Sequence, residues 1–89
     1  MLNNKEGIMK TGIRLYLVKA REAKGLSMHK AARLAGMSYQ HYSNFENGYR
    51  GSRVSFMIMA RIADALDLSL DFIKAREKEY QHANDNEDY

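Results

Sequence analysis

Apolar residues recur along this chain at the spacing of amphipathic helices, most clearly in residues 27–48. Ser27 and Ser38 each precede an apolar run, and a serine there can accept a hydrogen bond from a free amide of the first turn. Gly36 and Gly48 follow the two runs, and glycine ends helices because it adopts the left-handed conformation at little steric cost. The pattern therefore predicts two short helices joined by a tight turn. The residues of this segment expected to face the core are Ala31, Ala32, Leu34, Ala35, Met37, Tyr42 and Phe45.

Three further helices are predicted around this pair. One covers about residues 11–24 and ends at Gly25, another begins after Ser55, and the last begins after Ser69. No segment has the pattern of a strand, so the sequence predicts an all-α fold of five helices. The core positions expected in these three helices are Ile13, Leu17, Ala20, Phe56, Met59, Ile62, Ala63, Leu66, Leu70, Phe72 and Ile73.

The length of 89 residues leaves room for one small domain. A chain of this size buries only about 60 to 65% of its unfolded surface, so dimerisation would add to a modest stability. Residues 1–10 are expected to form a flexible arm, residues 11–80 the domain, and residues 81–89 an acidic, disordered tail that lacks apolar content.

Four short motifs carry a family resemblance. They are residues 21–27 (REAKGLS), 34–38 (LAGMS), 45–48 (FENG) and 62–66 (IADAL). In their order and spacing, residues 13–72 resemble the lambda-repressor-like (Cro and phage-repressor, XRE-type) helix-turn-helix domains. The resemblance implies a compact five-helix domain. The second helix of the pair in residues 27–48 is then expected to enter the major groove of DNA. The resemblance also implies a structural salt bridge between Arg21 and Glu46.

The same resemblance places Tyr39, Gln40 and Asn44 where related repressors contact base edges. Ser43 is predicted to face outward beside them as a further base contact, and His41 flanks them. Gln and Asn can each offer a donor and an acceptor to adenine, which gives about 1 to 3 kcal/mol of discrimination for a good bidentate contact. The Tyr39 ring can pack on a thymine methyl, or its hydroxyl can reach a phosphate. His41 either lies near the DNA backbone or is a solvated surface residue, and the second reading is favoured.

Phosphate contacts are expected from basic and polar residues at the helix starts and in the loop that follows residues 39–47. They are Arg50, Arg53, Lys30, Tyr49, and the amides beside Ser27 and Ser38. The alternative for each arginine is a surface charge without a partner.

Three departures from the family pattern limit what can be transferred. Met28 replaces a common glutamine, Val54 replaces a common proline, and Tyr39 and Tyr42 are aromatic where smaller or aliphatic residues are usual. No operator sequence can therefore be taken from a relative.

Charge is distributed unevenly along the chain. Residues 1–70 carry 11 Lys and Arg against 5 Asp and Glu, while residues 71–89 carry 3 against 6. The net charge of +6 in residues 1–70 favours binding to a polyanion. The net charge of −3 in residues 71–89 predicts a tail that points away from bound nucleic acid. The alternative is that both are ordinary solvated charges.

Surplus apolar residues indicate surfaces for association. Met57 and Ile58 form either a homodimer patch together with part of the last helix or part of the core, and Leu15 and Val18 make a second candidate surface for a protein partner.

Several classes of protein are disfavoured. The absence of cysteine excludes disulfides, thiolate catalysis and cysteine-bound zinc, and it fits a reducing compartment. The first residues lack the apolar run of an export signal or membrane span, so a cytoplasmic location is expected. His29, His41 and His82 lack metal-ligand spacing, and no catalytic motif is present. We therefore expect no enzyme, metal or cofactor.

Two functions remain. The first is a small repressor that binds an inverted-repeat operator in double-stranded DNA as a homodimer. The alternative is an antitoxin-like or partner-regulating protein-interaction module, because a fold does not fix a function.

Overall fold

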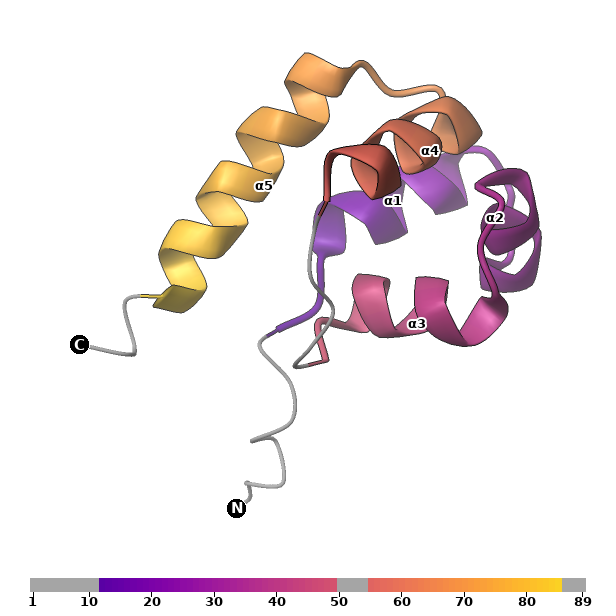
Figure 1. The fold of residues 1–89 in the computed structure, drawn as a ribbon, viewed down its shortest axis with the longest axis horizontal. Coiled ribbons are helices and arrows are strands. Elements are labelled where there is room, and N and C mark those ends of the chain that lie inside the picture. The colour runs from indigo at the N-terminus through magenta and orange to yellow at the C-terminus, as the bar shows by residue number, and fades with distance from the viewer. Residues whose placement is uncertain (1–11, 50–54, 86–89) are drawn as a thin grey trace.

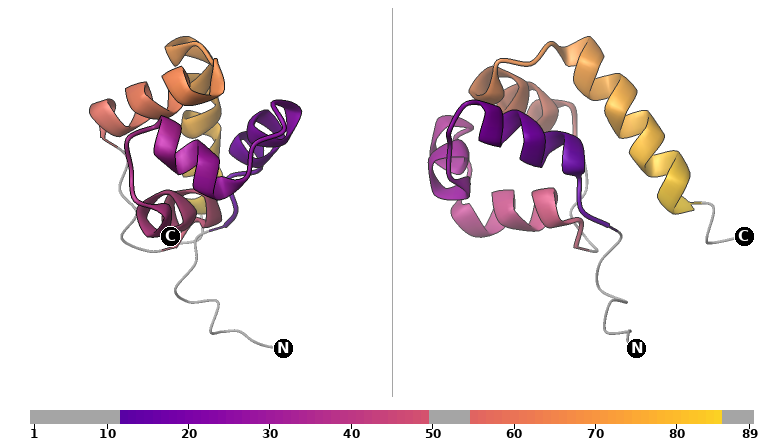
Figure 2. Two further views of the ribbon diagram at one scale, coloured as in Figure 1. Left: turned by 90° about the vertical axis from the view of Figure 1, so that its right-hand side faces the viewer. Right: turned by 180° about the vertical axis from the view of Figure 1, so that it is seen from behind.

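The computed structural model describes residues 12–49 and 55–85, and residues 1–11, 50–54 and 86–89 lie outside the description. The described part contains helices α1 (Leu15–Ala23), α2 (Met28–Leu34), α3 (Tyr39–Asn47), α4 (Phe56–Leu66) and α5 (Leu70–Asp85). Helices α1 to α4 group around a common core, and α5 runs along one side of this group (Figures 1 and 2). The prediction of an all-α fold with five helices is confirmed.

Serine caps begin four of the helices. The side chain of each accepts a hydrogen bond, at 3.0 to 3.2 Å, from the backbone amide three residues later. The four capping residues are Ser27, Ser38, Ser55 and Ser69. Because a cap satisfies an amide that has no partner within the helix, the predicted starts of α2 to α5 are confirmed.

The core is built mainly from small and aliphatic residues around two aromatic rings. Its buried members are Leu17, Ala31, Ala32, Ala35, Tyr42, Phe45, Ile62, Ala63, Ala65, Leu66 and Ile73. Ala20, Met37 and Met59 pack against them and are partly buried. The small alanines of α2 allow it to approach α3 and α4 closely.

The predicted core positions of five residues are wrong, because their side chains are exposed. They are Ile13 at 45%, Leu34 at 51%, Phe56 at 68%, Leu70 at 39% and Phe72 at 42%.

The reasons differ between these positions. Ile13 precedes α1, which begins at Leu15 rather than near residue 11, so helical spacing does not apply to it. Leu34 lies about 100° around the helix from the middle of the arc formed by the buried alanines of α2. Phe56 and Leu70 are each the first residue of a helix, where no preceding turn covers the side chain. Phe72 lines an open groove between α1 and α5.

The end of α5 also differs from the prediction. The helix continues to Asp85, past the expected boundary at residue 80, and the Gln81 amide donates to the Glu77 carboxylate at 2.7 Å. The expected arm (1–10) and the last residues of the expected tail (86–89) lie outside the described residues.

Candidate nucleic-acid interface

The recognition-helix candidate α3 buries one face and exposes the other. Tyr42 and Phe45 are 1% and 2% exposed, whereas Tyr39 is 39% exposed, Gln40 is exposed and Asn44 is half-buried. Ser43 is only 8% exposed and accepts a hydrogen bond from Asn47 at 3.2 Å, so its predicted outward position is wrong. A short side chain at the margin of a buried helix face is covered by its neighbours.

Gln40 and Asn44 are joined on the exposed face. The Gln40 Nε2 donates a hydrogen bond to the Asn44 Oδ1 at 3.0 Å, which is the ordinary (i, i+4) contact of a helix. The bond leaves the Gln40 carbonyl oxygen as an acceptor and the Asn44 amide as a donor. The two side chains therefore present one acceptor and one donor as a unit.

The predicted salt bridge between Arg21 and Glu46 is present. The guanidinium binds the carboxylate through two contacts, Nε to Oε1 at 3.0 Å and Nη2 to Oε2 at 2.8 Å. The hydrogen bonds to Glu46 raise the pKa of the Arg21 side chain above its ordinary value. Arg21 also donates to the Leu26 carbonyl at 2.9 Å, so the pair ties α1 and the connection between α1 and α2 to the end of α3.

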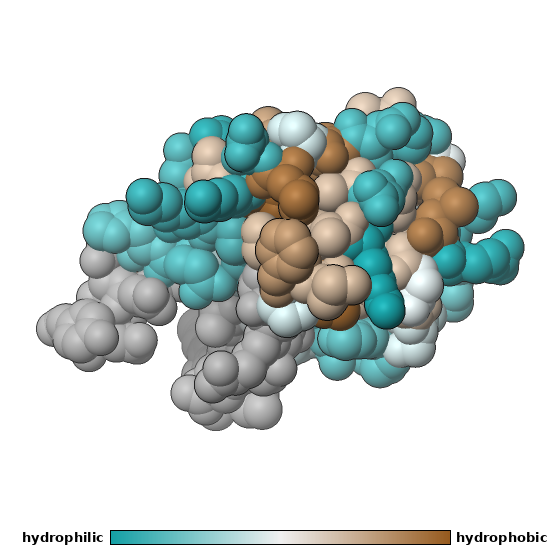
Figure 3. All heavy atoms as spheres, turned by 45° about the horizontal axis from the view of Figure 1, so that its top comes forward, coloured by the Kyte–Doolittle hydropathy of each residue, from teal (hydrophilic) through white to brown (hydrophobic). Residues whose placement is uncertain are grey.

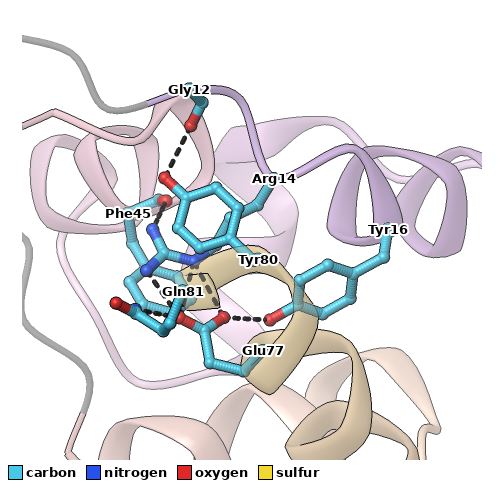
Figure 4. A network of polar contacts seen from close by, with 7 residues as sticks. All are labelled: Gly12, Arg14, Tyr16, Phe45, Glu77, Tyr80 and Gln81. Carbon is cyan, nitrogen blue, oxygen red and sulfur yellow. Dashed lines mark hydrogen bonds and ion pairs between the residues drawn. The ribbon is translucent and has the colours of Figure 1, made fainter. Parts of the chain in front are cut away.

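A second buried pair, which the sequence interpretation missed, ties α5 to the same end of α3. Arg14, 2% exposed, binds Glu77 through Nε at 3.0 Å and Nη2 at 2.8 Å (Figure 4). Its third nitrogen, Nη1, donates to the Phe45 carbonyl at 2.6 Å. The guanidinium lies 4.0 Å from the Phe45 ring centre and 4.2 Å from that of Tyr80.

Two hydroxyls and one amide complete this network. Tyr16 donates to Glu77 at 2.7 Å, Gln81 donates to the same carboxylate, and Tyr80 donates to the Gly12 carbonyl at 2.7 Å (Figure 4). Burial alone would raise the pKa of Glu77, but the hydrogen bonds from Arg14, Tyr16 and Gln81 outweigh it, so the pKa is lowered. Burial, and secondarily the bond to Glu77, raises the pKa of Tyr16.

One sequence signal could have revealed the network. Ile73, Glu77 and Tyr80 follow one another at helical spacing, so a carboxylate lies within an otherwise apolar stripe of α5. Such a carboxylate requires a cation from another element. Nothing in the sequence identified Arg14 as that cation.

The other predicted contact residues are placed as follows. Lys30 is exposed on α2, and Tyr49 is 38% exposed directly after α3, where its amide donates to the Asn44 carbonyl. Arg50 and Arg53 lie outside the described residues, so their phosphate contacts stay predictions.

The predicted association residues are divided between exposed and half-buried positions. Leu15 and Met57 are 59% and 58% exposed, whereas Val18 and Ile58 are half-buried. Ile58 packs against the core, so of the two apolar residues predicted for α4 only Met57 is largely exposed.

The residues that the structure describes show neither a metal site nor a membrane-spanning helix. They contain no group of three histidine, cysteine, aspartate or glutamate side chains placed to hold a metal ion. None of their helices is both long and apolar enough to cross a bilayer.

Comparison with known proteins decides the family. A family model for helix-turn-helix proteins matches residues 17–73, which run from within α1 to the start of α5. The chain belongs to the lambda-repressor-like helix-turn-helix family. The resemblance inferred from the four motifs is thus confirmed.

Two relatives of this helix-turn-helix protein are informative. The HTH-type transcriptional regulator AnsR of Bacillus subtilis (strain 168) is 36% identical over 67 residues, which make up 75% of this chain and 56% of that protein. The chain thus matches little more than half the length of this relative. The crystal structure of the restriction-modification controller protein C.AhdI from Aeromonas hydrophila superposes with a TM-score of 0.58 and 33% identity. That match covers 75% of this chain and 96% of C.AhdI.

Proposed function

We propose that this helix-turn-helix protein is a sequence-specific DNA-binding transcriptional regulator that acts as a repressor. The observation that carries the proposal is the exposed face of α3, where Gln40 and Asn44 form one hydrogen-bonded unit. The relatives support the class, since AnsR is named as a transcriptional regulator and C.AhdI as a controller protein.

The mechanism is direct readout of a base edge in the major groove. Adenine offers N7 as an acceptor and N6 as a donor, which complement the Asn44 amide and the Gln40 carbonyl. The two salt-bridged arginines hold the opposite, buried side of α3, because Arg21 binds Glu46 and Arg14 binds the Phe45 carbonyl. The helix is therefore positioned before DNA arrives, and little ordering is needed at the base edge.

Sequence-independent affinity comes from the phosphate backbone. The proposed contacts are Arg50, Arg53, Lys30 and Tyr49, with the amides beside Ser27 and Ser38. The basic balance of residues 1–70 supports this assignment.

Substitutions on α3 test the division between base and phosphate contacts. Asn44→Ala or Gln40→Ala is expected to weaken binding to the preferred site by about 5- to 100-fold while leaving random DNA nearly unchanged. Lys30→Ala is expected to weaken both equally and to flatten the salt dependence. The measurement is fluorescence anisotropy titration at several salt concentrations, on an operator first selected from a random duplex pool.

His41→Ala is the matched control for these variants, because His41 is exposed on the same helix and its side chain is not assigned to a base. Equal losses on selected and random DNA for Gln40→Ala, Asn44→Ala and Lys30→Ala would contradict the proposed division.

We also infer that the protein binds an inverted repeat as a homodimer through a dimer patch consisting of Phe56 and Met57. These side chains are 68% and 58% exposed at the start of α4. Apolar side chains gather over α4 on the face seen in Figure 3. A two-fold arrangement would place two recognition helices about one DNA turn apart, as two half-sites require.

Charge substitution in the dimer patch tests this assembly. Met57→Glu is expected to convert the dimer to monomer at micromolar concentration, as measured by sedimentation velocity. The variant is also expected to lose cooperative binding to two half-sites in the fluorescence anisotropy titration. Leu15→Glu is the matched control, because Leu15 is equally exposed but lies on α1. Dissociation by Leu15→Glu alone would place the interface on α1 instead.

The alternative of a protein-interaction module is supported by a groove between α1 and α5. The groove has a volume of about 670 Å³ and is lined in part by Leu15, Tyr16 and Phe72. If Leu15→Glu abolished function while the α3 variants did not, this alternative would replace DNA readout.

A further inference from the structure

An aromatic contact between the two helices of the motif is not explained by the core or by the proposed base contacts. The rings of His29 and Tyr39 are stacked, with 3.8 Å between their centroids and 11° between their planes. His29 is the second residue of α2 and Tyr39 is the first residue of α3. Both side chains are exposed, so the stack lies at the surface beside Gln40.

The stack restricts how Tyr39 can meet DNA. Stacking along one face favours one orientation of the Tyr39 ring, because a tyrosine has only two side-chain torsions. Its covered face cannot pack on a base, and only the opposite face and the ring edge remain available. The edge of an aromatic ring is suited to apolar contact with a thymine C5-methyl in the major groove.

We propose that His29 is a specificity-positioning residue, which holds the Tyr39 ring so that it reads a thymine methyl in each half-site. The proposal rests on the proposed function, because it assigns a role within the same DNA-reading surface. It also decides between the two possibilities left open by the sequence, a thymine methyl or a phosphate, in favour of the methyl.

The surroundings of the stack support a role in reading rather than in folding. The side chain of His29 is exposed on α2 and is not part of the hydrophobic core. The local fold is held by other contacts, since Ser27 and Ser38 cap the two helices and Arg21 binds Glu46. Removal of the imidazole is therefore expected to change the freedom of Tyr39 while leaving α2 and α3 in place.

The experiment replaces thymine by deoxyuridine, one position at a time, in the operator selected by the wild-type chain. Deoxyuridine lacks only the C5-methyl, so pairing and backbone are retained. The wild type is expected to lose about 3- to 10-fold in affinity at one thymine per half-site. His29→Ala and Tyr39→Ala are expected to lower affinity for the unmodified operator and to become insensitive to that substitution.

Two variants make this result specific to stacking. His29→Phe keeps an aromatic ring and is expected to retain the sensitivity to deoxyuridine, whereas His41→Ala removes an exposed imidazole from α3 and is expected to behave as wild type. The double variant His29→Ala/Tyr39→Ala is expected to be no weaker than Tyr39→Ala, because His29 acts through the tyrosine. Thermal unfolding of each variant verifies that the domain is intact.

Several outcomes would overturn the inference. A wild-type chain without sensitivity to deoxyuridine excludes the methyl contact, and retained sensitivity in His29→Ala excludes the positioning role. Uniform weakening of His29→Ala and His29→Phe on all DNA, with a flatter salt dependence, would make His29 a phosphate contact. Failure of the wild type to select any operator would instead refute the proposed function itself.

Discussion

Replacing Arg14 with methionine is expected to lower the free energy of unfolding by about 3 to 5 kcal/mol. The substitution leaves the buried Glu77 carboxylate without its cation and the Phe45 carbonyl without the Nη1 donor. It also removes the charge that lies between the Phe45 and Tyr80 rings. Urea unfolding followed by circular dichroism measures the change.

An exposed ion pair provides the matched control for this variant. Lys24 contacts Asp67 at 3.1 Å, but their side chains are 36% and 81% exposed. Lys24→Met is expected to cost less than about 1 kcal/mol, because water screens such a pair. The double variant Arg14→Met/Glu77→Leu should recover much of the lost stability, since no charge is then left buried alone. Equal costs for Arg14→Met and Lys24→Met would contradict the assignment.

The buried pair also makes stability depend on pH. The pKa of Glu77 is lowered in the folded protein, so its contribution is fully present above the ordinary glutamate pKa and is lost as the pH falls through the lowered value. Glu77→Gln is therefore expected to reduce the loss of stability below about pH 4.5. The comparison is made by urea unfolding across acidic pH.

Gly48→Ala is the second change with a large expected effect, at about 2 to 5 kcal/mol of destabilisation. Gly48 ends α3 with a positive φ of 74°, which is strained for a residue with a Cβ. An added Cβ would collide with the Gly12 carbonyl oxygen and would lie 2.6 Å from the Tyr80 hydroxyl. The methyl group would therefore break the hydrogen bond between Tyr80 and Gly12, which anchors the last turns of α5.

Gly25 separates the backbone effect from the collision. Its φ is 70°, close to that of Gly48, but a Cβ added there meets nothing within 4 Å. Gly25→Ala is therefore expected to cost only the conformational strain of about 1 to 2 kcal/mol. Thermal and urea unfolding of the two variants should differ clearly, and equal costs would show that the contact with Gly12 and Tyr80 is unimportant.

These two changes act on the same place, the C-terminal end of the recognition helix. Arg21 binds its last turn from α1, and Arg14 binds it from the residue before α1. From α5, Glu77 binds the Arg14 side chain and Tyr80 binds the Gly12 carbonyl. In the proposed function this end is fixed, while the beginning of the helix is presented to DNA. Loss of either anchor is thus expected to weaken DNA binding through disorder of α3 rather than through a missing contact.

The accuracy of sequence interpretation depended on the distance between interacting residues. Serine caps and the left-handed glycines were predicted because each acts on amides and carbonyls within a few residues. Helical periodicity does not apply to Ile13, which precedes α1, and Leu34 lies to one side of the buried arc of α2, so both predicted core positions are wrong. For Phe56 and Ser43, periodicity does not show which neighbouring element covers the side chain, so Phe56 is exposed and Ser43 is buried.

The sequence by itself determined the five helices, their caps and the family, since these depend on local hydrogen bonding and on motifs a few residues long. Only the tertiary structure decided that Arg14 meets Glu77 across 63 residues and that His29 stacks on Tyr39. Caps require only neighbouring residues, whereas the buried ion pair and the stacked rings require helices to be docked at one distance and angle. That docking is set by the packing of the whole core, which no local pattern contains.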